Sequence, residues 1–167
     1  MACKSAPLVY VNKPALQKIQ KVAVFPFANA SKEPHAGEIV TQIFFTELVK
    51  THQFQVEEMG NIMDFFIKQR IEQKDKIDKT RLTLLRNQFK VDAVFLGTVR
   101  EFEEKGTIPI VEISLRLIET QTDQVIWRGS IERTGEDYVT ILNIGRIRSL
   151  NKLTQYAVRE LLKTTQK

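Results

Sequence analysis

The sequence predicts an α+β fold, in which helices pack on a mixed five-stranded β-sheet. Short runs of β-branched and aromatic residues alternate with stretches whose apolar residues recur at helical spacing, which gives the order β-α-β-α-α-β-β-β-α. The length of 167 residues corresponds to about one domain. A composition of 43% hydrophobic and 27% charged residues is typical of a globular chain with a single core.

The first strand and the first long helix follow a proline-broken segment. KVAVFPFAN (residues 21–29) is apolar on both faces, which predicts a buried central strand. Pro26 cannot donate to a β-ladder and is expected to end it. HAGEIVTQIFFTELVKTHQ (residues 35–53) then predicts an amphipathic helix. The apolar residues at helical spacing in this segment are Ile39, Ile43, Phe44 and Leu48.

A short second strand and two further helices come next. FQVEE (residues 54–58) alternates apolar and polar residues and predicts a strand. GNIMDFFIKQRIEQ (residues 60–73) carries apolar residues at helical intervals and predicts the second helix. RLTLLRNQF (residues 81–89) predicts a third helix, for which Thr80 is the expected N-cap.

The second half of the chain predicts an antiparallel meander and a closing helix. Residues 91–104, 111–120 and 124–133 read as three strands joined by turns. Trp127 lies in the last of them, where it could be either packed core or an exposed anchor. Ser149 is the expected N-cap of the final helix. The apolar stripe of that helix consists of Leu150, Leu153, Ala157 and Leu161.

The domain organisation follows from these elements. Residues 1–17 contain two prolines among mixed polar residues and are expected to form an extended tether. Residues 18–167 are expected to form one globular domain without internal repeats. No apolar run approaches the roughly 18 to 20 residues that a membrane-crossing helix needs.

The positive charge does not by itself identify a partner. The formal net charge is +5, but the basic residues alternate with acids, as in KQRIEQKDKIDKTR (residues 68–81), which is typical of a solvated helical face. The basic stretch GRIRSLNKL (residues 145–153) lacks the interleaved aromatic residues of a nucleic-acid platform. The sequence therefore does not favour a nucleic-acid partner.

The supply of catalytic groups is small. His35 and His52 are the only histidines, and neither belongs to a metal-binding motif. The loop after the first strand has a single glycine, Gly37, and no phosphate-binding pattern. Acids such as Glu57 and Glu58 are adjacent on a strand, point to opposite faces and are expected to face solvent. The sequence predicts no enzyme activity, no metal and no cofactor.

Four segments carry a family resemblance. They are KVAVFPFAN (residues 21–29), FQVEE (54–58), DAVFLGTV (92–99) and LRLIETQTDQVIWRGS (115–130). In this order the chain resembles the bacterial envelope lipoproteins that include CsgG, LpoB and PelC, whose fold also occurs in the N-terminal domain of TolB. These motifs are strand and turn signatures, and none of them is catalytic.

The resemblance implies a function without catalysis. In the curli channel of this family, two long segments supply membrane-crossing hairpins, and each crossing strand needs about 9 to 11 residues. The corresponding connections here, residues 100–110 and 134–145, are short, so we expect no pore of its own. The chain looks like the compact members: an oligomeric scaffold of an envelope export or surface-structure machine, or alternatively a monomeric activator of a cell-wall synthase.

The same resemblance gives Cys3, the only cysteine, a role. Bacterial lipoproteins are cleaved before a cysteine preceded by small residues, and Ala2-Cys3 fits the end of such a site. We therefore expect lipid attachment at Cys3, with Met1-Ala2 as the remnant or replacement of a signal peptide. Lys4, in place of an aspartate, points to the periplasmic face of the outer membrane of a Gram-negative bacterium.

Two connections are the expected partner-binding surfaces, because loops on a rigid scaffold often carry binding. One follows the first strand and the other precedes the final helix. The expected partners are other envelope proteins and further copies of this chain. The candidate residues are Asn29, Ser31, Lys32, His35, Tyr138, Arg146 and Arg148.

Overall fold

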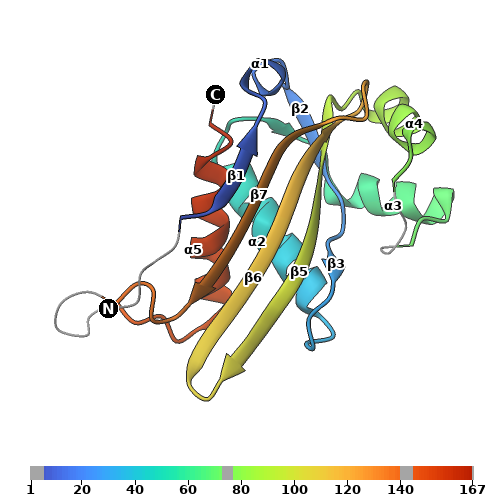
Figure 1. The fold of residues 1–167 in the computed structure, drawn as a ribbon. Coiled ribbons are helices and arrows are strands. Elements are labelled where there is room, and N and C mark those ends of the chain that lie inside the picture. Colours follow the sequence, from blue (N-terminus) through green and yellow to red (C-terminus); the bar gives the residue numbers. More distant parts are fainter. Residues whose placement is uncertain (1–5, 73–76, 140–144, 167) are drawn as a thin grey trace.

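One mixed sheet organises the chain (Figure 1). The computed structural model describes residues 6–72, 77–139 and 145–166. The strands are β1 (Leu8–Val11), β2 (Lys21–Val24), β3 (Ala28–Asn29), β4 (Gln55–Val56), β5 (Ala93–Lys105), β6 (Ile108–Glu119) and β7 (Val125–Thr134). The helices are α1 (Lys13–Leu16), α2 (Ala36–Lys50), α3 (Met59–Gln69), α4 (Lys79–Phe89) and α5 (Leu150–Lys163).

The predicted α+β class is confirmed, and the sheet is larger than expected. Its order is β1-β7-β6-β5-β2-β4, with β3 pairing with β5, so it has seven strands rather than five. β5, β6 and β7 form the predicted antiparallel meander, and β2 lies parallel to both β5 and β4. The predicted strand over residues 21–29 is divided, because the chain leaves the ladder around Pro26 and pairs again as β3.

The first of the two added strands corrects the expected extent of the tether. Residues 8–16, predicted to be extended and unpaired, form β1 and the short helix α1. β1 pairs antiparallel with β7, with Tyr10 opposite Arg128, and so covers the otherwise open edge of the meander. The Asn12 side chain accepts a hydrogen bond from the Ala15 amide at 3.3 Å, and Pro14 lies in the first turn of α1, where its missing N–H costs nothing.

Local signals at the other boundaries were partly right. The Ser149 hydroxyl accepts from the Lys152 amide at 3.3 Å, so the predicted cap of α5 is confirmed. The cap of α4 is Asp78, whose Oδ1 accepts from the Arg81 amide at 2.8 Å, and the prediction of Thr80 was wrong. Residues 100–110 are not a free connection, because β5 and β6 stay paired up to the turn at Gly106 (φ 67°).

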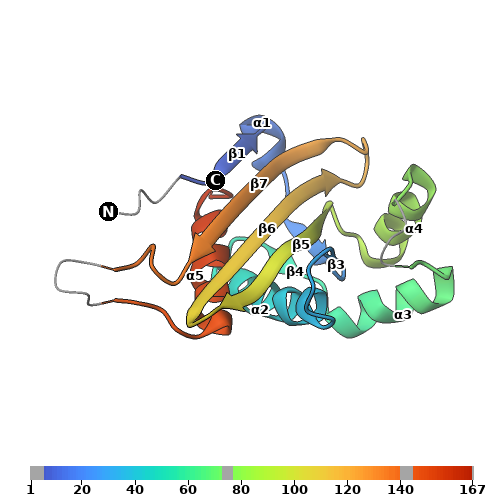
Figure 2. The same ribbon diagram turned by 60° about the horizontal axis from the view of Figure 1, so that its bottom comes forward.

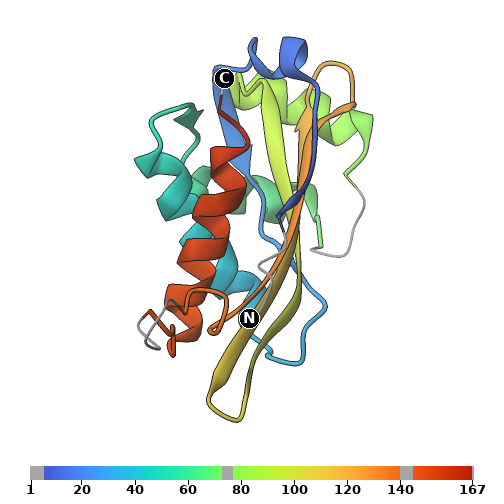
Figure 3. The ribbon, with the colours of Figure 1, turned by 60° about the vertical axis from the view of Figure 1, so that its left-hand side comes forward.

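The helices α2 and α5 cover one face of the sheet (Figure 3). The main core lies between them and the inward residues of the strands. Trp127 is fully buried there, and its Nε1 donates to the Thr164 hydroxyl at 3.0 Å, just after α5. Trp127 is therefore a packed core residue and not an exposed anchor. Phe95 packs edge-on against it, with ring centroids 6.1 Å apart.

An ion pair joins the two covering helices. Nε of Arg159 on α5 donates to Oε2 of Glu47 on α2 at 2.7 Å, and Nζ of Lys50 lies 2.9 Å from the other carboxylate oxygen. The Glu47 side chain is 4% exposed, whereas that of Arg159 is 48% exposed. Hydrogen bonding from Arg159, opposed by burial of the carboxylate and assisted by Lys50, holds the pKa of Glu47 below its usual value of 4.5.

The helices α3 and α4 cover only part of the opposite face (Figure 2). Their apolar residues pack on the outward side of β2 and the first part of β5, where Phe25 meets Phe66 edge-on at 4.7 Å. At this margin Lys21 pairs with Glu57 at 2.6 Å, so Glu57 is buried and the expectation that it faces solvent was wrong. In the described part of the chain, no helix packs over the remaining outward positions of β6, β7 and β1.

The close packing of Trp127 on Gly129 gives a first prediction. A Cβ at Gly129 would lie 2.6 Å from Cζ2 of Trp127 and 2.9 Å from Cδ2 of Leu161. Gly129→Ala is therefore expected to lower the free energy of unfolding by about 1–3 kcal/mol, measured by urea denaturation. Gly60→Ala is the control, because nothing lies within 4 Å of its Cβ position on α3, and it should stabilise by about 0.5 kcal/mol. Equal effects of the two substitutions would contradict the packing.

The ion pair of Glu47 gives a pH prediction. Because the pKa of Glu47 is lower in the folded than in the unfolded protein, its contribution is present above about pH 4.5 and is lost as the pH falls through the folded-state pKa. Glu47→Gln is expected to destabilise by about 1–2 kcal/mol at pH 7, with the difference from wild type shrinking below pH 4.5. Urea denaturation across this range measures it. The exposed Glu38→Gln on the same helix should change little, and parallel pH profiles for wild type and Glu47→Gln would refute the prediction.

Candidate functional site

The uncovered sheet face presents a pair of arginines. Arg116 on β6 and Arg128 on β7 are directly opposite each other in the antiparallel register. Leu96 on β5 flanks Arg116, and Tyr10 on β1 flanks Arg128, so the four residues form one row across four strands. Both arginines are exposed, as is Tyr10. This row is called the basic row below.

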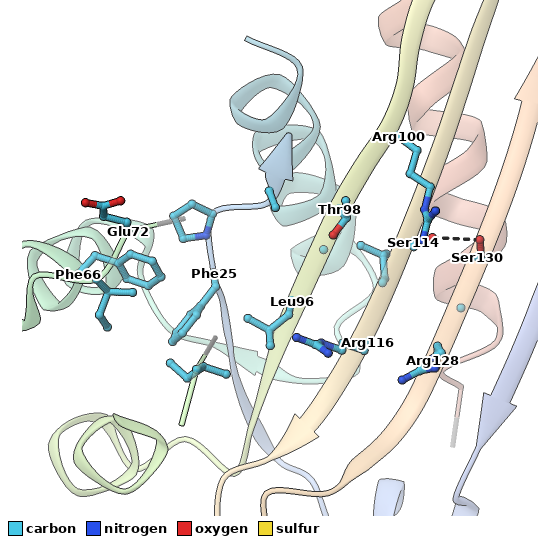
Figure 4. Close-up of a pocket in the computed structure, with 17 residues that line it drawn as sticks. Phe25, Phe66, Glu72, Leu96, Thr98, Arg100, Ser114, Arg116, Arg128 and Ser130 are labelled. Carbon is cyan, nitrogen blue, oxygen red and sulfur yellow. Dashed lines mark hydrogen bonds between the residues drawn. The ribbon is translucent and has the colours of Figure 1, made fainter. Parts of the chain in front are cut away.

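A row of hydroxyl side chains lies next to the basic row. Thr98, Ser114 and Ser130 occupy the next outward positions of β5, β6 and β7. The Ser114 and Ser130 hydroxyls are 3.2 Å apart and form a hydrogen bond (Figure 4). Because these side chains are small, they form a low polar floor between taller neighbours.

The third row carries acids. Glu101, Glu112 and Glu132 follow one another across β5, β6 and β7. A bulge between Val99 and Glu101 adds Arg100 to the outward side, and its Nε lies 3.7 Å from Oε1 of Glu112. In Figure 4 the Arg100 side chain extends toward the serine pair. The hydroxyl row is therefore bordered by arginines on both sides.

A groove lies between these rows and the partial helical layer, which forms its apolar wall. The residues of that wall are Phe25, Pro26, Phe66, Ile71 and Ile77. The cavity volume is about 540 Å³. In Figure 4 the side chain of Arg116 extends toward Leu96 and the apolar wall. The groove thus combines guanidinium groups, hydroxyls and an apolar side.

The charges of the groove are unevenly compensated. The acids near the hairpin have basic neighbours: Lys105 lies 3.2 Å from Glu103 and 3.9 Å from Glu101. Within the described ranges, no carboxylate lies within ion-pair distance of Arg116 or Arg128. Like charges directly opposite each other in a sheet are destabilising. Among the described residues, the two positive charges of the basic row therefore have no ion-pair partner beside the polar floor.

This arrangement suits the binding of an anionic ligand. Guanidinium groups hold carboxylates or phosphates through paired hydrogen bonds, and hydroxyls can donate or accept beside them. Among the described residues, Glu72 is the only carboxylate that lines the groove. In the part of the chain that the structure describes, no cluster of histidine, cysteine and acidic residues could hold a metal ion.

The first predicted loop is held mainly by its own contacts. The Asn29 amide donates to the carbonyl oxygens of Glu33 at 2.7 Å and Pro34 at 3.2 Å, and its Oδ1 accepts from the Ser31 hydroxyl at 2.7 Å. Asn29 and Ser31 therefore shape the turn before α2. Lys32 and His35 are exposed, and His35 occupies the N-cap position of α2 without a capping hydrogen bond from its side chain.

The second predicted loop is fastened to α5. The Tyr138 hydroxyl donates to Glu160 at 2.6 Å, and burial together with this hydrogen bond raises the pKa of Tyr138. Arg146 pairs with Glu136 at 2.8 Å within the loop, and Arg148 is exposed. The loop residues 140–144 and the predicted lipid site Cys3 lie outside the described residues.

The structure places the two predicted loops toward one end of the molecule, without joining their candidate residues in one cluster. A shallow hollow of about 360 Å³ at that end is lined by Lys32 from the first loop and Leu150 at the start of α5. None of the seven predicted loop residues, all of which the structure describes, lines the groove on the open sheet face.

Sequence reasoning missed the groove, although one signal for it exists. Ser114 and Arg116, and likewise Arg128 and Ser130, are alternate residues flanked by apolar inward positions. Folding the chain symmetrically about the turn at residues 120–124 brings these pairs opposite each other.

Among the described residues, no helix is long and apolar enough to cross a membrane.

Solved structures share this fold. A PelC dodecamer from Paraburkholderia phytofirmans matches with a TM-score of 0.67 and 20% identity, over 96% of each chain. Lipoprotein GNA1162 from Neisseria meningitidis matches at 0.59 and 18% identity, over 69% of this chain and 82% of that chain. The LpoB C-terminal domain from Salmonella enterica matches at 0.51 and 12% identity, over 74% and 95%. Neither a protein-family model nor a curated protein sequence matches this chain. The predicted resemblance is confirmed at the level of the fold.

Proposed function

We propose that this chain is a non-catalytic, lipid-anchored component of a bacterial envelope export or surface-structure machine, and that it works as a homo-oligomeric ring without a pore of its own. The observation that carries the proposal is the match to the PelC dodecamer over 96% of both chains. That extent includes nearly the whole described fold, with β1 and α1 at its start.

The alternative is a monomeric activator that docks on a cell-wall synthase. It is favoured by the match to the LpoB C-terminal domain, which covers 74% of this chain with a TM-score of 0.51. The ring ranks first because the PelC match is both longer and closer, at 96% and 0.67. On either reading the domain acts by binding other envelope proteins, at the periplasmic face of the outer membrane.

The exposed residues of the two loops are the proposed partner-binding positions. Lys32, His35 and Arg148 point into solvent from a rigid frame, and Arg146 is half-exposed in spite of its pair with Glu136. Asn29, Ser31 and Tyr138 support these positions through the contacts described above. Lipid attachment at Cys3 would hold this frame at a membrane.

The ring is tested by the mass of the assembled protein. Native mass spectrometry and light scattering on the purified 167-residue chain are expected to give a species near twelve times 19.3 kDa, with the monomer appearing on dilution. If the protein stays monomeric at high concentration and crosslinks to a cell-wall synthase, the activator proposal would replace the ring proposal. A strict monomer without any crosslinked envelope partner would contradict both readings.

The anchor is tested at the N-terminus of protein from its native cells. Mass spectrometry of the N-terminal peptide is expected to show acyl chains on Cys3, with the protein in the outer-membrane fraction. Cys3→Ser should move the protein to the soluble periplasmic fraction while leaving its fold, measured by circular dichroism, unchanged. An unmodified Cys3 in the native protein would overturn the proposed anchor.

A further inference from the structure

The open sheet face holds a positively charged groove whose occupant the proposed function does not name. We propose that this groove binds a segment of an acidic polysaccharide, with Arg116 and Arg128 holding its carboxylates and the hydroxyl row of Thr98, Ser114 and Ser130 contacting its hydroxyl groups. The choice of a glycan over other polyanions rests on the proposed envelope role. The other arguments for the proposal come from the charge and the shape of the groove.

The first argument is electrostatic. Arg116 and Arg128 are direct cross-strand neighbours, so the folded protein brings two like charges together at a cost. Elsewhere on this face the protein compensates its charges, as in the approach of Arg100 to Glu112 and of Lys105 to Glu103. An anion between the two guanidinium groups would remove the repulsion and would gain hydrogen bonds from both.

The second argument concerns the floor of the groove. Ser114 and Ser130 point the same way and share one hydrogen bond at 3.2 Å, which leaves each hydroxyl with further hydrogen-bonding capacity. The floor is low because the side chains are small, so a flat ligand can approach the backbone plane of the sheet. A sugar acid carries hydroxyl and carboxylate groups on one ring, so it can contact the hydroxyl row and the adjacent basic row together.

The third argument favours a chain over a small anion. The groove is open along the sheet, and its volume of about 540 Å³ far exceeds one phosphate or carboxylate. Its basic groups lie on both sides of the hydroxyl row, with Arg100 on one side and Arg116 and Arg128 on the other (Figure 4). The apolar wall at Phe25 and Leu96 offers a surface for the C–H face of a sugar ring.

The experiment measures binding of an oligogalacturonate about eight sugars long by isothermal titration calorimetry. Wild-type protein is expected to bind it, and the affinity should fall as salt is added. Arg116→Gln and Arg128→Gln are each expected to weaken binding about tenfold, and the double variant more than thirtyfold. Arg86→Gln with Lys68→Gln is the control, because it removes two exposed positive charges from α4 and α3 and should weaken binding less than threefold.

Further ligands test which kind of molecule the groove binds. A neutral maltooligosaccharide of the same length should not bind, and inorganic phosphate should bind much more weakly than the oligogalacturonate. Tighter binding of an oligoglutamate peptide than of the oligogalacturonate would overturn the glycan in favour of an acidic protein partner. Equal binding by wild type and the double variant would place the ligand elsewhere and would overturn the site.

Thermal melting distinguishes a ligand site from a structural role. The double variant is expected to melt at the same temperature as wild type or higher, because it loses a like-charge pair. A lower melting temperature together with retained binding would show that the arginines serve the fold. The result is separable from the ring: a monomer that binds oligogalacturonate contradicts the proposed assembly alone, and a ring that does not bind it contradicts the groove alone.

Discussion

Period-two alternation along β6 and β7 imposes two requirements on the same short segment. Trp127 must point inward to reach α5, and Arg128 must then point outward beside Arg116. A shift of one residue in the pairing would exchange the two faces, placing the guanidinium in the core and the indole in solvent. The buried tryptophan therefore fixes the register, and the register fixes the basic row. Gly129 belongs to the same requirement, since the space of its missing side chain is filled by the Trp127 ring.

The helices divide the sheet into a sealed face and a partly open one. α2 and α5 close the first face over the main core and are joined by the pair of Glu47 and Arg159. α3 and α4 are short and pack only over β2 and the beginning of β5, where Phe25 and Phe66 meet. The meander extends beyond their reach, and most of its outward residues there are polar, such as Arg116, Ser130 and Glu132. A rigid, charged and hydroxyl-rich surface results, supported from behind by close-packed side chains, which is the usual condition for a preorganised binding surface.

The sequence predicted those parts of the fold that depend on local chemistry. The prediction of Ser149 as the N-cap of α5 was correct because a cap depends on residues within one turn of the helix. The prediction of the meander was correct because each strand alternates apolar and polar residues and each turn is short. β1 was missed because a four-residue strand beside a proline acquires its structure only from the edge of β7, 116 to 122 residues away along the chain. The basic row was missed for a similar reason, since Arg116 and Arg128 become neighbours only when the register of two strands is considered together. The loop candidates were chosen by position, and the structure shows that Asn29 and Tyr138 use their polar atoms within the fold.

The order of the three rows limits how a polyanion could lie on the open face. The acidic row of Glu101, Glu112 and Glu132 is on the hairpin side of the hydroxyl row, and the basic row is on the other side. A bound polyanion that ran along the strands would pass over the acids and be repelled there. One that ran across the strands would follow the basic row from Leu96 toward Tyr10 and keep its charges near the two arginines. This direction leads to β1 at the edge of the sheet, where Tyr10 lies opposite Arg128.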